Sequence, residues 1–100
     1  MTLPLHVREE AEVELRAARI WYDEKSPGLG KQFLSCVEAA FAVIGRHPSR
    51  FRQVFGEVRQ ALVRRFPFVV LYVIESDGIH VMAVFHGSRD PSGSAASVEA

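Results

Sequence analysis

The spacing of the apolar residues changes once along this chain, and the change separates a helical part from a strand part. Before His47 the apolar side chains recur every three or four residues, whereas beyond Pro48 they alternate or run together. A spacing near 3.6 indicates amphipathic helices, and alternation indicates strands with one covered face. The pattern therefore predicts that both helices precede most of the strands, an order typical of α+β folds.

Two helices are predicted in the first half of the chain. The first covers residues 8–25, where Ala11, Leu15, Ala18 and Tyr22 make one apolar stripe. Ser26–Pro27–Gly28 interrupts the stripe, and we expect Ser26 to cap the second helix. That helix runs from Leu29 to His47, because the residue before a proline avoids the helical region. So short a link predicts an antiparallel helical hairpin.

The strands are predicted at residues 3–7, 51–55, 58–65, 68–74 and 79–86. The segment 68–74 is almost wholly apolar, as in a central strand covered on both faces. In the last strand, alternation separates an apolar set, expected to face the helices, from a set that contains His80 and His86 and is expected to face away. The apolar set is Ile79, Val81, Ala83 and Phe85.

These elements predict an α+β two-layer sandwich. An N-terminal strand and the helical hairpin pack on one face of an antiparallel meander sheet, and the other face is left for a ligand. We expect one domain over residues 1–91 and a disordered tail over 92–100, which is rich in Gly, Ser and Ala. The single cysteine, Cys36, excludes an internal disulfide and is expected in the core. With no signal peptide and no membrane-length apolar run, a cytoplasmic location is expected.

The positive charges of the chain are concentrated in one short stretch. Residues 46–65 contain six arginines against one glutamate, or +5, although the formal charge of the whole chain is zero. Arginine suits bidentate recognition of carboxylates and phosphates. We therefore expect the function of the chain to lie in this stretch.

Candidate catalytic residues are few. His80 and His86 are six residues apart on a strand, about 20 Å, so a shared metal ion is not expected, and no cofactor motif is present. A ribonuclease that uses the RNA 2′-hydroxyl needs an acid or base and cations on the phosphate. His86 could supply the first, Arg59 or Arg65 the second, and Tyr72 a hydrogen bond. The alternative is that the arginines and His86 are surface residues and that Tyr72 is core.

Short motifs in a fixed order cover residues 3–91. They are Ala11–x–x–x–Leu15 with Trp21–Tyr22, Pro27–Gly28–Leu29–Gly30–x–x–Phe33, Ile44–x–x–x–Pro48, Val58–Arg59, Arg65–Phe66–Pro67–Phe68–x–Val70–x–Tyr72, and Val81–x–Ala83–Val84–x–His86–x–x–Arg89–x–Pro91. With these motifs the chain resembles the RelE/ParE superfamily of bacterial type II toxin–antitoxin toxins, sometimes described as plasmid stabilisation proteins.

The resemblance implies a toxin that a cognate antitoxin neutralises in a hetero-oligomer. RelE-like members cut messenger RNA on the ribosome, whereas ParE-like members inhibit DNA gyrase and are not nucleases. The segments 27–30 and 65–68 look more ParE-like, so a gyrase-binding toxin is the leading interpretation. The alternatives are a RelE-like nuclease using Arg59, Arg65 and His86, and an inactive relative that only binds antitoxin, since Ser92–Ala96 replaces a usual Trp and Arg. The expected antitoxin or target contacts are Arg50, Arg52, Arg59, Arg64, Arg65 and Arg89.

Overall fold

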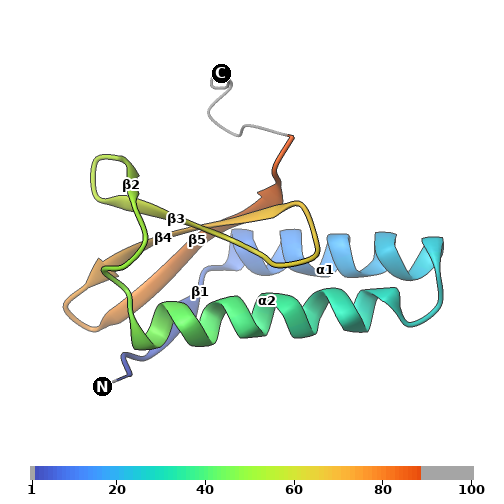
Figure 1. The fold of residues 1–100 in the computed structure, drawn as a ribbon, viewed down its shortest axis with the longest axis horizontal. Helices are drawn as coiled ribbons and strands as arrows, with labels where there is room; N and C mark the ends of the chain where they lie inside the picture. The colour runs from blue at the N-terminus through green and yellow to red at the C-terminus, as the bar shows by residue number, and fades with distance from the viewer. Residues whose placement is uncertain (1, 89–100) are drawn as a thin grey trace.

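A computed structural model describes residues 2–88, which form two helices and a five-stranded sheet (Figure 1). In chain order the elements are β1 (Leu5–Val7), α1 (Glu9–Lys25), α2 (Leu29–Arg46), β2 (Gln53–Phe55), β3 (Val58–Leu62), β4 (Phe68–Glu75) and β5 (Gly78–His86). The helices form the predicted antiparallel hairpin along one face of the sheet, which confirms the α+β sandwich. Neither of them is long and apolar enough to cross a membrane. The predicted tail lies outside the described residues.

The sheet is mixed rather than wholly antiparallel. Its strand order is β1-β5-β4-β3-β2, and strands β2 to β5 make the predicted meander. The edge strand β1 pairs in parallel with β5, with Leu5 opposite Ile79 and Val7 opposite Val81. The first and last strands of the described chain are therefore neighbours, and β4 lies at the centre.

The main core lies between the helical hairpin and the sheet. The predicted stripe of α1 faces it, because Ala11 and Tyr22 are buried and the two residues between them pack against the same cluster. Tyr22, Phe33, Phe66 and Phe68 stack there with ring centroids 4.8–6.0 Å apart. Such tilted and edge-on pairs stabilise beyond the area that they bury. Cys36 packs against this core only partly buried.

The link between the helices differs from its prediction. Ser26 makes no side-chain cap on α2, and Gly28 precedes the helix with a φ of 86°. The acceptor at this end of α2 comes from α1 instead, because the Gly30 N–H donates to Asp23 Oδ1 at 2.8 Å. An exposed serine next to a proline and a glycine resembles a cap in sequence, but the left-handed turn at Gly28 moves Ser26 out of the capping position.

A β-bulge in β5 overturns the predicted faces of that strand. Leu71 lies opposite Ala83 but Tyr72 lies opposite Val81, so Met82 is an extra residue in β5. One inserted residue moves every later side chain to the other face. Val84 is consequently buried in the core under the helices. The histidines separate too, with His80 facing away from the helices and His86 on the helix-facing side opposite Phe68.

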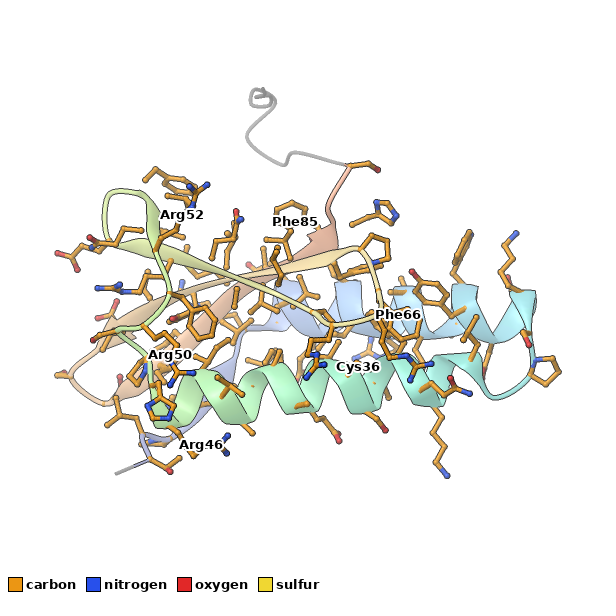
Figure 2. The ribbon with its side chains drawn as sticks, viewed as in Figure 1. Cys36, Arg46, Arg50, Arg52, Phe66 and Phe85 are labelled. Atoms are coloured by element: carbon orange, nitrogen blue, oxygen red, sulfur yellow. The ribbon has the colours of Figure 1, made fainter. Side chains whose placement is uncertain are left out.

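The centre of the sheet face away from the helices is apolar. Val58, Val69, Leu71 and Phe85 form a second buried cluster there, which explains why β4 is apolar on both faces. Phe85 projects from this face in Figure 2. The predicted strand 58–65 ends at Leu62, which is 65% exposed.

Candidate functional site

Arg59 and Tyr72 hold the connection between α2 and β2. They are opposite each other on β3 and β4. Arg59 Nη1 donates to the carbonyl oxygens of Phe51 at 2.5 Å and Ser49 at 3.3 Å, and the Tyr72 hydroxyl donates to that of Pro48 at 2.6 Å. These two side chains are thus engaged in hydrogen bonds to the backbone carbonyls of the connection.

Tyr72 is also closed to solvent, with an exposed fraction of 0%. Burial raises the pKa of its phenol to about 12, although the positive charge of Arg59 acts in the opposite direction. The Tyr72 phenol is part of the core between the helices and the sheet, and a substrate cannot reach it unless these two layers separate.

Arg65 lies in the turn between β3 and β4 and has an unusual backbone. Its φ is 73°, in the left-handed region that non-glycine residues rarely adopt. The exposed side chain reaches α2, where Nη2 donates to Gln32 Oε1 at 3.1 Å. The guanidinium also lies 5.9 Å from the Phe66 ring centroid. A strained backbone that presents an arginine at the surface is typical of a contact residue.

His86 lies at the end of β5, half-buried, with its ring edge-on to Phe68 at a centroid distance of 5.5 Å. Its Nδ1 accepts a hydrogen bond from the Ser88 backbone N–H at 3.1 Å and lies 2.7 Å from Ser88 Oγ. Because Nδ1 is an acceptor, the neutral ring carries its proton on Nε2.

The structure does not bring the predicted catalytic residues together. Tyr72, opposite Arg59, and Phe68, opposite His86, are four residues apart on β4, which is about 13 Å. Arg65 turns toward α2. Arg89 lies outside the described residues. No common phosphate position is formed by Arg59 and His86 at that separation.

The fold divides the exposed arginines of the basic stretch into two groups. Arg46, Arg50 and Arg52 follow the chain from the end of α2 toward β2 (Figure 2). Arg64 and Arg65 lie at the β3–β4 turn, near Gln32 in the first turn of α2. Gln32 and Arg46 are 14 residues apart on that helix, about 21 Å. Within residues 2–88, no carboxylate lies within 4.0 Å of a guanidinium of the basic stretch.

A groove runs between α1 and the end of β5, and we call it the α1–β5 groove. Its volume is about 510 Å³. It is lined by Val13, Glu14, Ala17, Ala18, Trp21, Tyr22, Phe68, Val84, Phe85, His86 and Ser88. Trp21 is 54% exposed and Val13 51%. The groove therefore joins an apolar wall to a polar end at His86.

Sequence reasoning missed this groove, although one signal for it was present. Val13, Ala17 and Trp21 recur at i, i+4 and i+8, which makes a second apolar stripe on α1 beside the stripe that faces the core. A helix with two apolar faces buries one in its own domain and leaves the other for a partner.

Comparison with known proteins gives related toxins. The chain is 27% identical over 99 residues to Toxin ParE2 of Mycobacterium tuberculosis, covering 98% of this chain and 94% of the relative. Its fold matches the structure titled "Chromosomal ParDE TA system from P. aeruginosa" with a TM-score of 0.75, at 15% identity over 85% of this chain and 96% of that one. It also matches the RelBE2 toxin–antitoxin complex of M. tuberculosis with a TM-score of 0.57, at 20% identity over 86% and 99%.

The profile of one family covers most of the sequence. It is described as the ParE toxin of the type II toxin–antitoxin system parDE, and it matches residues 5–91. The matched range includes every helix and strand of the structure. The predicted resemblance to the RelE/ParE superfamily is thereby confirmed, and the chain belongs to the ParE toxin family of type II toxin–antitoxin systems.

Proposed function

We propose that this chain is a ParE-like toxin that acts by binding a protein target, DNA gyrase by family resemblance, and that a cognate antitoxin neutralises it. The matched structures from P. aeruginosa and M. tuberculosis are titled as a toxin–antitoxin system and a toxin–antitoxin complex. The observation that carries the proposal is the α1–β5 groove, because it is an apolar surface without a covering element within residues 2–88.

The lining of the α1–β5 groove fits an antitoxin segment that has one apolar face. Tryptophan is one of the side chains enriched among the residues that dominate binding at protein interfaces. The stripe of Val13, Ala17 and Trp21 offers anchors at helical spacing, and a second amphipathic segment can lie along it.

The two groups of exposed arginines favour an antitoxin segment that also contains acidic residues. Gln32, which Arg65 contacts, and Arg46 are about 21 Å apart along α2, a distance that roughly seven residues of extended chain can span. Since no carboxylate of residues 2–88 pairs with these arginines, their charges are available to a partner. Opposite charges across an interface speed association and fix its register.

The RelE-like nuclease is the alternative and is less well supported. It needs Arg59, Arg65 and His86 around one phosphate, yet Arg59 donates to loop carbonyls and lies about 13 Å along the sheet from His86. A protein-binding toxin has no such requirement.

The test compares three measurements on the purified chain: gyrase supercoiling, messenger cleavage in a translating cell-free extract, and growth of cells that express it with and without the neighbouring antitoxin. We expect growth arrest that the antitoxin relieves, loss of supercoiling and intact messenger. Cleavage that appears only during translation would replace the proposal with the nuclease. Antitoxin binding without growth arrest would leave an inactive relative.

The groove itself is tested with Trp21→Glu, for which Ile20→Glu is the matched control. Ile20 is 46% exposed on the same helix but does not line the groove. Burying a charge in an apolar contact is costly, so Trp21→Glu should weaken antitoxin binding at least about 100-fold, while Ile20→Glu stays within a few-fold. Equal affinities in calorimetric titrations of the two variants would remove the groove from the interface.

A further inference from the structure

Three potential metal ligands meet at the β1 edge of the sheet, outside the lining of the α1–β5 groove. His6 on β1 lies directly opposite His80 on β5, and Asp77 comes from the β4–β5 turn. The two imidazole centroids are 4.9 Å apart, and His80 Nε2 lies 2.8 Å from Asp77 Oδ1. One ligand atom from each of the three residues lies within 4.8 Å of the other two.

The topology of the sheet creates this cluster. Parallel pairing sets His6 and His80 side by side on the face away from the helices, although 74 positions separate them in the chain. The tight turn at Gly78, with a φ of 134°, brings Asp77 back over His80. His80 and His86 are too far apart along β5 to share an ion, whereas His6 reaches His80 only through the pairing of β1 with β5 in the folded sheet.

We infer that His6, Asp77 and His80 form a binding site for one divalent cation of the zinc class. Two imidazoles and a carboxylate are a ligand set that zinc accepts, with the fourth position open to water. Imidazole also suits nickel and copper, so the shared chemistry is that of a borderline transition-metal ion.

The distances need only small side-chain movements. Ligand atoms around tetrahedral zinc are roughly 3.3 Å apart, given bonds of about 2.0–2.1 Å. The pair at 2.8 Å must open slightly and the widest pair must close from at most 4.8 Å. His6 and Asp77 are exposed, so solvent leaves both side chains room to move, and His6 Nε2 lies 3.4 Å from the Asp77 backbone oxygen. The ion would replace the hydrogen bond between His80 and Asp77.

A cation here would stabilise one edge of the sheet. The strand β1 has three residues and pairs only with β5. A metal bound jointly by β1, β5 and the β4–β5 turn would favour the folded chain, since the unfolded chain does not hold the three ligands together.

The experiment uses the full chain without an affinity tag, freed of metal with a chelator and then titrated with Zn²⁺ and Co²⁺. We expect one Zn²⁺ per chain in calorimetry, visible absorption bands typical of low-coordinate Co²⁺, and a Tm that rises by about 5–10 °C with excess Zn²⁺. His6→Gln and His80→Gln should each weaken Zn²⁺ binding at least about tenfold.

His47→Gln is the matched control, because His47 is exposed at the end of α2 and outside the cluster. It should bind Zn²⁺ as the natural chain does. Asp77→Asn gives an independent test, since asparagine suits the same turn, and it should weaken binding while the far-ultraviolet spectrum stays unchanged. The inference is overturned if the chain binds no Zn²⁺, or if the His6 and His80 variants bind it as well as His47→Gln does.

Discussion

At the scale of single residues, Tyr72 joins the centre of the sheet to the end of the helical hairpin. Its ring is buried between the layers, and its hydroxyl donates to the carbonyl oxygen of Pro48. The neutral phenol is the form that the folded chain accommodates, which is why burial raises its pKa to about 12 from an ordinary value of 10.0. Stability should therefore depend on the charge state of one side chain.

We predict that Tyr72→Phe lowers the free energy of unfolding at pH 7 by about 1 kcal/mol, because the Pro48 carbonyl loses its donor. The raised pKa contributes stability that is present below pH 10 and is lost as the pH rises toward 12, at up to about 1.4 kcal/mol per pH unit. Urea unfolding from pH 9 to 11.5 should show a shallower decline for the variant. Burial also raises the pKa of Tyr22, so the informative quantity is the difference between the two proteins. Parallel curves would contradict the assignment.

At the scale of elements, the helical hairpin depends on a close approach at Gly30. A Cβ atom at this position would collide with the carbonyl oxygen of Arg19 and come within 2.9 Å of Asp23 Oδ1. The same Asp23 oxygen accepts the Gly30 N–H. Only glycine lets α2 begin so near the backbone of α1.

We predict that Gly30→Ala destabilises the chain by about 2–3 kcal/mol, because the collision is with backbone that cannot move without separating the helices. Ser35→Ala, on an exposed position of α2, is the control and should stay within about 0.5 kcal/mol. Both are measured by urea unfolding. A Gly30→Ala chain as stable as the control would mean that the helices pack less closely than described.

A hydrogen bond joins a side chain of α1 to the backbone of β5. Glu14 Oε1 accepts the Val84 N–H at 2.8 Å, beyond the point where β1 stops pairing with β5. Glu14→Ala should cost about 1–2 kcal/mol and speed hydrogen exchange of the Val84 amide, whereas Glu14→Gln keeps an acceptor oxygen and should restore most of both. Arg16→Ala, exposed on the same helix, should change neither. Unaltered exchange in Glu14→Ala would show that the Val84 N–H has another partner.

The elements differ in how far the sequence predicted them. The helices were predicted well, because the pattern that specifies them repeats within four residues. The faces of β5 were predicted wrongly past Met82, because alternation contains no mark of a bulge. The meeting of His6 with His80 could not be predicted, since a pairing across 74 positions depends on the completed sheet. The site residues Arg59 and Tyr72 were placed on the right strands, but their loop partners were invisible in the sequence.

At the scale of the whole molecule, the two arginine groups allow the charged contacts with a partner to be separated. Arg59 is unsuitable for this purpose, because its replacement would release the loop that it holds. We predict that Arg50→Glu with Arg52→Glu, and separately Arg64→Glu with Arg65→Glu, each weaken antitoxin binding about tenfold or more and reduce its dependence on salt. The two pairs make the same change in charge, so a difference between their effects reports the position of the contact and not the change in net charge. If neither pair alters the affinity in titrations at two salt concentrations, the basic stretch does not contact the antitoxin.

The parallel pairing of β1 with β5 has a consequence for the time at which the fold can be completed. Synthesis proceeds from the N-terminus, and the partner of Leu5 is Ile79, which is made 74 residues later. At about 5–20 residues per second, the first strand waits roughly 4–15 s for its neighbour. The helical hairpin can assemble during that interval, because its contacts are local, but the edge of the sheet cannot close. A newly made chain therefore contains the sequence of both helices for several seconds before the strand that closes the sheet has been made.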